Sequence, residues 1–401
     1  LGNVVETLGP GGTGYEVISN LSDLDSLIAL GSSGNWMVTG NIVLDSSKVV
    51  PPYVSMTFNG GVIDCNSFTL EGDNTLIRVG REKIFAPGSI LGGTWQNKDV
   101  YIEWWGVGVD GLIDAKSSIE AASMLKGELH FPKLIAIDSV TTISSDVWLS
   151  GHTEGTSIVT TISGEIFRST SDWLKITKFN HTSSTTNNTF LEPLSFFVTI
   201  ASQTGGAPAI VATEIIINNN RITNSKVLYA DTIVSDRVEL SGNKVDKPTQ
   251  FTFRVNALLN DTSGSQVDKL FAKENIITNI NGGLSDKSNT ARCFQVEALY
   301  SELEGNILDG AESTTASNFA YIKDGSYKIF NNTIKAIKGQ STTAIIDNKG
   351  GGSYTTYIDA YGNVFDQTDV DHADTPETCV RVYAASNVSF HDNKFHNLKS
   401  Y

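Results

Sequence analysis

The chain has few cysteines, a shortage of basic residues and no long apolar run, and each shortage argues against a class of protein. Its three cysteines, Cys65, Cys293 and Cys379, are too few and too widely spaced for a disulfide framework or a metal site. Lysine and arginine number 29 against 44 aspartates and glutamates and form no cluster, which argues against nucleic acid as a partner. The lack of an apolar run of bilayer length argues against a membrane segment.

Amphipathic helical spacing is also missing from residues 213–397, which argues against a helical solenoid. The same stretch contains one short phrase seven times, marked by Asn220, Asn243, Asn275, Asn306, Asn332, Asn363 and Asn393. Successive markers are 23, 32, 31, 26, 31 and 30 residues apart. Such a period is typical of a solenoid, in which each repeat buries its apolar face by stacking on its neighbours.

The residues around each marker predict a β-strand that ends at the asparagine. Positions five before, three before and two after the marker are mostly apolar, whereas positions four and two before it are mixed. An apolar residue at every second position indicates a strand with one face in the core. We expect the asparagine to form a corner in left-handed backbone, with its amide donating along the stack to its equivalents.

A second strand is predicted about half a repeat upstream of most markers, at 251–255, 293–296, 319–323, 343–346 and 379–382. Two or three strands per turn of 23 to 32 residues, each paired with its equivalent one turn on, are typical of a parallel β-helix. The predicted fold class is therefore all-β, a right-handed parallel β-helix with a small N-terminal β-region and a capping α-helix.

The first quarter of the chain has a different pattern. Residues 21–30 predict a short helix, and 36–95 contain short strands separated by Gly and Asn turns. A further helix is predicted at about 114–126, where it would cover the first coil of the β-helix. We expect an N-terminal β-rich head or neck region at 1–100 and a β-helix domain at 101–401.

Residues 102–152 open with an acidic and aromatic phrase that precedes the second predicted helix. Its informative positions are Glu103, Trp104, Trp105, Gly106, Asp110, Gly111, Asp114, Ile119, Phe131 and Pro132. The phrase resembles the E-W-F-G-A-x-G-D-G-x-x-D-D motif, followed by a helix and a strand ending in F-P, of the pectate-lyase-like bacteriophage tailspikes and related polysaccharide depolymerases. It departs from that motif at Val109 and Ala115, where Gly and Asp are usual, and in a Gly turn reduced to Gly127.

This resemblance implies a tailspike depolymerase that binds and cleaves a bacterial surface polysaccharide, such as capsule, O-antigen or exopolysaccharide. It also implies a homotrimer in the virion tail, facing the host and joined to other tail proteins through segments beyond this sequence. The motif carries no information about catalytic residues, which must be sought on the outward rows of the repeats.

Two glutamates in the fourth repeat are the predicted catalytic pair. Glu302 and Glu304 are outward neighbours on one strand, about 6.6 Å apart along the backbone, which approaches the separation of carboxyl groups in inverting glycosidases. Lys328, one rung away, would keep Glu302 ionised as a base, and the apolar ring of Phe330 would favour the protonated form of Glu304 as an acid. Asp359, roughly 9.6 Å from Glu302 by backbone, could replace Glu304.

Aromatic residues surround the same area and could stack on sugar rings. The predicted substrate-binding residues are Tyr300, Tyr321, Lys328, Phe330, Tyr357 and Tyr361. No cofactor or metal is expected, although an acidic loop at 366–374 could hold a cation through its carboxylates. His391 and His396 are interpreted as structural or surface residues.

Three other interpretations remain open. The charged rows could be ordinary surface ion pairs of a long β-helix. The chain could be a polysaccharide lyase of the same architecture, in which Lys328, Arg381 and Tyr361 would matter more than the carboxylates. It could also be a receptor-binding spike or adhesin that binds a glycan without cleaving it.

Overall fold

The chain divides into two compact units. Unit 1 comprises Leu1–Ala136 with Asp146–Trp148, and unit 2 comprises Ile137–Ser145 with Leu149–Tyr401. The computed structural model describes residues 14–108, 110–160, 165–182, 196–201, 210–231, 233–248, 250–256, 266–281, 291–313, 317–323, 325–338, 344–348, 356–368, 378–382 and 386–397. Within these ranges no helix is long and apolar enough to cross a membrane.

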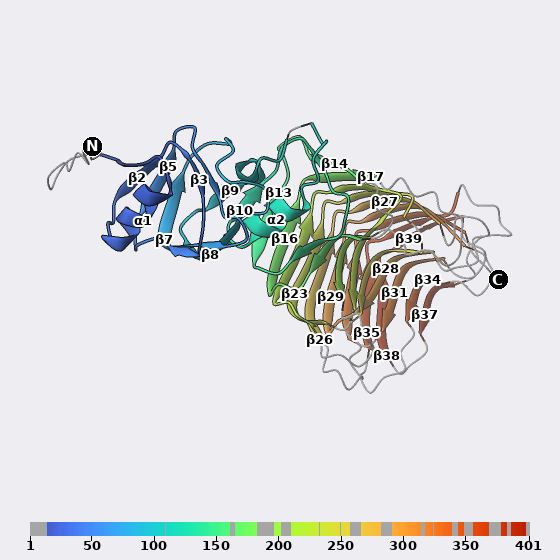
Figure 1. Cartoon of the computed structure of the whole chain (residues 1–401). Coiled ribbons are helices and arrows are strands. Elements are labelled where there is room, and N and C mark those ends of the chain that lie inside the picture. Colours follow the sequence, from blue (N-terminus) through green and yellow to red (C-terminus); the bar gives the residue numbers. More distant parts are fainter. Residues whose placement is uncertain are drawn as a thin grey trace, which may run out of the picture. The chain divides into compact units, whose positions relative to one another are not determined.

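Unit 2 is a parallel β-helix whose coils each contribute strands to three sheets (Figure 1). Sheet I runs through β13 (Val147–Ser150), β16 (Trp173–Thr177), β20 (Glu214–Asn218), β23 (Ile233–Ser241), β26 (Gln266–Lys273), β29 (Tyr300–Glu304), β32 (Ser326–Phe330), β35 (Thr356–Tyr361) and β38 (Ser386–His391), with β19 (Ile210–Val211) paired to β23. Sheet II contains β14 (Thr156–Val159), β17 (Phe179–Thr182), β21 (Arg221–Thr223), β24 (Lys244–Asp246), β27 (Ile276–Asn281), β30 (Ile307–Glu312), β33 (Thr333–Lys338), β36 (Val364–Asp366) and β39 (Lys394–His396). Sheet III contains β12 (Thr141–Ile143), β15 (Glu165–Ser169), β18 (Phe196–Ala201), β22 (Lys226–Asp231), β25 (Phe251–Asn256), β28 (Ala291–Glu297), β31 (Ser317–Lys323), β34 (Ala344–Asn348) and β37 (Thr378–Val382). The predicted fold class is confirmed.

The marker asparagines form the predicted ladder at the corner between sheets I and II. The Nδ2 atom of Asn275 donates to Oδ1 of Asn306 at 2.9 Å, and Nδ2 of Asn306 donates to Oδ1 of Asn332 at 3.0 Å. The same amides also bond backbone groups, as when Asn306 donates to the carbonyl of Ala272 at 2.8 Å. The markers from Asn220 to Asn363 are fully buried. Each rung therefore supplies hydrogen-bond partners to polar groups that would otherwise be buried without one.

One detail of the corner was predicted wrongly. The left-handed residue is the one before the marker, because φ is 64° at Gly242, 62° at Gly305 and 57° at Asn331. This residue makes the sharp turn out of sheet I, where glycine and asparagine carry the smallest steric cost. The marker itself is thereby free to point its amide into the stack.

The inward rows pack into one core, as the periodicity predicted. Leu240, Ala272, Leu303 and Ile329 occupy successive rungs in register and are fully buried. Polar Ser301 also occupies an inward position, next in the stack to the large side chain of Tyr327.

The last described coil departs from the inward pattern. Val388 and Phe395, which were predicted to point inward, are 41% and 44% exposed. Among the described residues no strand lies beyond β38 in sheet I or beyond β39 in sheet II to cover them.

Unit 1 is also built mainly from parallel strand pairs, which the sequence did not reveal. Its strands are β1 (Glu16–Ile18), β2 (Asn35–Val38), β3 (Asn41–Val43), β4 (Lys48–Val49), β5 (Ser55–Phe58), β6 (Val62–Asp64), β7 (Thr69–Arg78), β8 (Ile90–Trp95), β9 (Asp99–Tyr101), β10 (Glu128–His130) and β11 (Leu134–Ala136). The two predicted helices are present as α1 (Leu21–Ala29) and α2 (Lys116–Ser123). The capping role expected of α2 stays a prediction.

The motif at the start of the second helical region forms a buried turn. Residues Ile102–Trp105 make the 3-10 helix η1, which ends at Gly106 with φ 79°. The indole nitrogens of Trp104 and Trp105 donate to the carbonyls of Gly80 at 2.6 Å and Ser89 at 3.1 Å. Both rings are buried, so this acidic and aromatic phrase serves the packing of unit 1.

Candidate functional site

The candidate site lies on the outer face of sheet I, where three outward rows run across the rungs. The central row places Glu239, Phe271, Glu302, Lys328 and Asp359 in register, and the next row places Ser241, Lys273, Glu304, Phe330 and Tyr361 in register. A third row runs through Glu214, Arg237, Lys269, Tyr300, Ser326 and Tyr357. The alternation of parallel strands therefore brings the predicted residues of this sheet to one surface.

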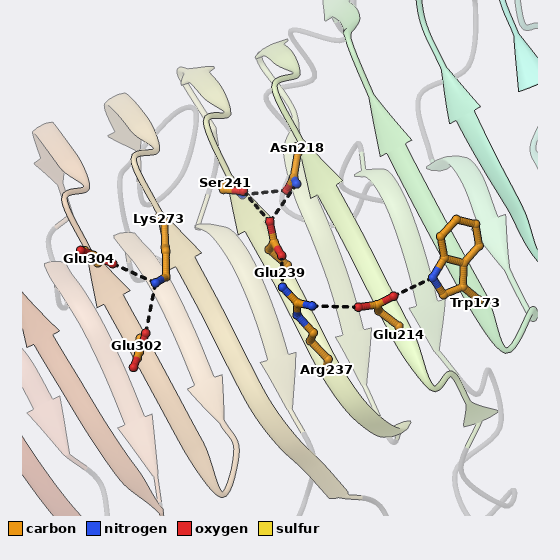
Figure 2. A network of polar contacts seen from close by, with 9 residues as sticks. All are labelled: Trp173, Glu214, Asn218, Arg237, Glu239, Ser241, Lys273, Glu302 and Glu304. Atoms are coloured by element: carbon orange, nitrogen blue, oxygen red, sulfur yellow. Dashed lines mark hydrogen bonds and ion pairs between the residues drawn. The ribbon is translucent and has the colours of Figure 1, made fainter. Parts of the chain in front are cut away.

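Glu302 and Glu304 point outward, as predicted, and share one cation. The ammonium nitrogen of Lys273 lies 3.1 Å from Oε2 of Glu302 and 2.9 Å from Oε2 of Glu304 (Figure 2). Hydrogen bonding to Glu304 is the main reason that the pKa of Lys273 is raised. The sequence named Lys328 as the partner of Glu302, whereas the ammonium in direct contact is that of Lys273.

Glu302 is held in its ionised form. Burial alone would raise the pKa of Glu302, but hydrogen bonds from Tyr300 and Lys273, with the charges of Lys273 and Lys328, lower it below its ordinary value. The Tyr300 hydroxyl donates to Oε1 of Glu302 at 2.5 Å. Burial, followed by this bond to a carboxylate, raises the pKa of Tyr300.

Lys328 lies beside Tyr300. Its ammonium is 5.8 Å from the centre of the Tyr300 ring, and its contact with the Tyr300 phenol is the first cause of its raised pKa. Lys328 is therefore a charged, exposed side chain that acts on Glu302 through space.

Phe330 and Tyr361 form a flat aromatic column that His391 continues. The Phe330 and Tyr361 rings are 5.1 Å apart with an interplanar angle of 9°, and the Tyr361 and His391 rings are 5.2 Å apart at 5°. His391 was predicted only as a surface or structural residue, and its place in this column was not predicted. The signal for it was present, since His391 occupies the same position before its marker as Tyr361 does.

Asp359 lies beside a hollow on the same face. The hollow has a volume of about 400 Å³ and is lined by Ser326, Tyr327, Lys328, Tyr357, Ile358, Asp359, Asn387, Val388 and Ser389. Tyr357 is 49% exposed at this hollow, and Nε2 of His391 lies 3.4 Å from Oδ1 of Asp359. The hollow is therefore lined by a carboxylate, Asp359, a cation, Lys328, and an aromatic side chain, Tyr357.

Tyr321 does not belong to this surface. It lies on β31 in sheet III, is 8% exposed, and has the guanidinium of Arg292 3.7 Å from its ring centre. The sequence predicted residues 319–323 as a second strand of the coil but did not show that this strand belongs to a different sheet from the site. Arg381, considered for the lyase alternative, also lies in sheet III, where it pairs with Asp347.

Several other candidates fall outside the site. Most of the acidic loop at 366–374 lies outside the described residues, and His396 is exposed on β39. In unit 1, Asp99, Glu128 and His130 offer ligand atoms within 4.8 Å of one another, a group that no sequence motif marks. Nε2 of His130 already lies 2.8 Å from Oδ1 of Asp99, and we assign no ligand to these residues.

The chain has little similarity to known proteins. No family model matches the chain, and no curated protein matches it. Among solved structures it is similar to the ORF18 protein of Geobacillus virus E2, with 12% sequence identity and a TM-score of 0.36. The match covers 73% of this chain and 62% of that one. The site is therefore argued from the chain's own residues.

Proposed function

We propose that unit 2 binds a bacterial surface polysaccharide on the outer face of sheet I and hydrolyses a glycosidic bond there, as a tailspike depolymerase would. The observation that supports this proposal most is a fixed, outward carboxylate, that of Glu302, on a surface that also carries aromatic side chains. Tyr300 and Lys273 hold that carboxylate in place, and the Phe330–Tyr361 column follows on the next rungs. Aromatic faces next to fixed carboxylates suit the apolar faces and hydroxyl groups of sugars.

Glu302 is proposed as the general base. Glu302 is ionised near neutral pH, as a glutamate of ordinary pKa also is, and its contacts with Tyr300 and Lys273 fix the position from which it could take a proton from the attacking water. The acid would then protonate the leaving glycosidic oxygen from the other side of the bond.

By its separation from Glu302, Asp359 suits the role of acid better than Glu304 does, and it would have to take up a proton before acting, because its charge contributes to the raised pKa of His391. The Oε2 atoms of Glu302 and Glu304 contact one nitrogen and so lie within about 6 Å of each other, below the separation of about 6.5–9.5 Å typical of inverting enzymes. Asp359 stands two rungs from Glu302, about 9.6 Å by backbone, and borders the hollow. Glu304 could act only after Lys273 released it.

The experiment replaces each carboxylate singly and measures reducing ends released from purified bacterial surface polysaccharides. E302Q and D359N are expected to lose at least a hundredfold in turnover, because each removes a proton-transfer group. Glu312→Gln on β30 of sheet II is a matched control that should retain full turnover. Full activity in both E302Q and D359N would reject the site.

A second candidate function is binding without cleavage, which one observation favours. Lys273 forms an ion pair with both Glu302 and Glu304. Such pairing is expected of carboxylates that take part in surface ion pairs and not in catalysis. Retention of polysaccharide with unchanged chain length would support this receptor-binding function. Products that absorb as unsaturated uronates would instead support the lyase.

The virion tail location and the homotrimer are proposed from the family resemblance alone. Sedimentation of the purified chain would test the trimer, and labelling of phage particles with an antibody against the chain would test the location.

A further inference from the structure

The outer face of sheet I carries a polar network on the strands that precede the candidate site. Nε1 of Trp173 on β16 donates to Oε2 of Glu214 at 2.7 Å (Figure 2). Arg237 on β23 then bridges two carboxylates, at 3.2 Å from Oε1 of Glu214 and 2.5 Å from Oε2 of Glu239. None of these residues was identified from the sequence as part of a site.

The network is fixed in place by further hydrogen bonds. Oε1 of Glu239 accepts from Nδ2 of Asn218 at 3.0 Å and from the hydroxyl of Ser241 at 3.0 Å. Oδ1 of Asn218 in turn accepts from the backbone N–H of Ser241 at 3.1 Å. Side chains held in this way present polar groups to a ligand with little loss of conformational entropy on binding.

Phe271 on β26 joins this network to the candidate site. The Arg237 guanidinium and the Lys273 ammonium each lie 5.5 Å from its ring centre, and the Tyr300 ring lies 6.5 Å away. The network and the candidate site thus form one surface. At about 4.8 Å per rung, the strands from β16 to β29 lengthen it by about 19 Å.

The charges on this surface are balanced, although the chain as a whole has a formal charge of −15. In the three outward rows from β16 to β35, the cations Lys175, Arg237, Lys269, Lys273 and Lys328 match the carboxylates Glu214, Glu239, Glu302, Glu304 and Asp359 one for one. Arg237 and Lys273 each contact two of those carboxylates. A polyanionic glycan would have to compete with these carboxylates for the cations, whereas sugar hydroxyl groups can bond both.

We propose that the polysaccharide bound by this face is uncharged and that its binding surface extends along sheet I to Trp173. The inference rests on the proposed function and narrows it to a substrate class. Trp173 and Phe271 would stack on sugar rings, while Arg237 and Glu239 would bond their hydroxyl groups. An uncharged substrate also disfavours the lyase alternative, because β-elimination requires a sugar carboxylate.

The test uses the intact chain on an array of purified bacterial surface polysaccharides, some neutral and some rich in uronate. Binding is expected to neutral members only. With the neutral polysaccharide bound best, Trp173→Ala should weaken binding about tenfold through loss of stacking, and Trp173→Phe should weaken it much less. Lys244→Ala, an exposed change on β24 of sheet II, is the matched control and should leave binding unchanged.

The other possible results contradict different parts of the proposal. Preferential binding of uronate-rich members would overturn the inferred substrate class and leave the proposed function standing. Binding of neutral polysaccharides that is unaffected by Trp173→Ala and by Phe271→Ala would show that the binding surface does not extend to these residues. The Phe271 variant serves as a second test in case Trp173→Ala fails to fold. Binding to no polysaccharide would reject the proposed function itself.

Discussion

The Tyr300 hydroxyl donates a hydrogen bond to Oε1 of Glu302, its neighbour on the same outward face of β29. This bond is one of the interactions that outweigh burial and lower the pKa of Glu302. It couples an aromatic side chain of the proposed sugar-binding surface to the proposed base.

Removing that hydroxyl should therefore shift the acid side of the pH–rate profile. In Tyr300→Phe the pKa of Glu302 rises toward its ordinary value, so the base becomes protonated at higher pH and activity is lost earlier on acidification. Tyr229→Phe, on β22 of sheet III, is the control. An acid limb at the same pH in wild type and Tyr300→Phe would show that this bond does not tune the base.

The asparagine ladder should be the most sensitive polar element of the fold. Asn306→Ala removes the acceptor for both the backbone N–H and the side-chain amide of Asn275, and it leaves the carbonyl of Ala272 without that donor. Each buried group left unsatisfied costs about 1–3 kcal/mol, so the free energy of unfolding should fall by about 3 kcal/mol or more. Urea denaturation would measure the loss.

Asn306→Asp is the matched variant for the ladder. It keeps an acceptor for Asn275 but loses the amide donor to Asn332. Its effect on stability therefore separates the accepted hydrogen bond from the donated one. A loss below about 0.5 kcal/mol in Asn306→Ala would contradict a stabilising ladder, because that is the range of ordinary surface substitutions.

Buried His181 on β17 should make stability depend on pH. Burial lowers the pKa of His181 to about 4, so His181 is neutral in the folded state at neutral pH. The stabilisation is complete above the unfolded pKa of about 6.5 and is lost as pH falls toward 4, for a total of about 3 kcal/mol. His181→Phe should lack this part of the pH dependence when unfolding is compared at pH 7 and pH 4.5. Parallel pH dependence in the two proteins would contradict it.

His391 should titrate above its ordinary pKa. The hydrogen bond with Asp392 is the first cause of the raised pKa, and the charge of Asp359 adds to it. A His with a raised pKa stabilises the fold below its unfolded pKa and loses that contribution as pH rises through the folded value. Asp392→Asn should move the His391 titration, followed by NMR, to lower pH. An unchanged titration would show that Asp392 is not the cause.

Much of unit 2 could be predicted because the marker asparagines fix the register. Once the asparagines are aligned, every outward neighbour follows, and the rows through Glu302 and Glu304 are found as predicted. The direction of long side chains does not follow from register. Lys273 is in register with Glu304 but also reaches Glu302, while Lys328, in register with Glu302, lies against the Tyr300 ring.

Other features could not be predicted because no repeat marks them. Tyr321 was expected to border the site from the second strand of its coil, but this strand belongs to sheet III, because each coil contributes strands to three sheets. The parallel pairing in unit 1 has no marker residue comparable to the asparagines. Glu214, Arg237 and Glu239 could have been found by applying the outward positions to the first two repeats, whereas Trp173 lies in a coil that has no marker asparagine.

Binding and cleavage of one polysaccharide by Glu302→Gln and by wild type separate a catalytic Glu302 from a structural one. We expect the variant to retain the polysaccharide with an affinity close to that of wild type and to release at least a hundredfold fewer reducing ends. Equal release of reducing ends by the two proteins would show that Glu302 is not the base.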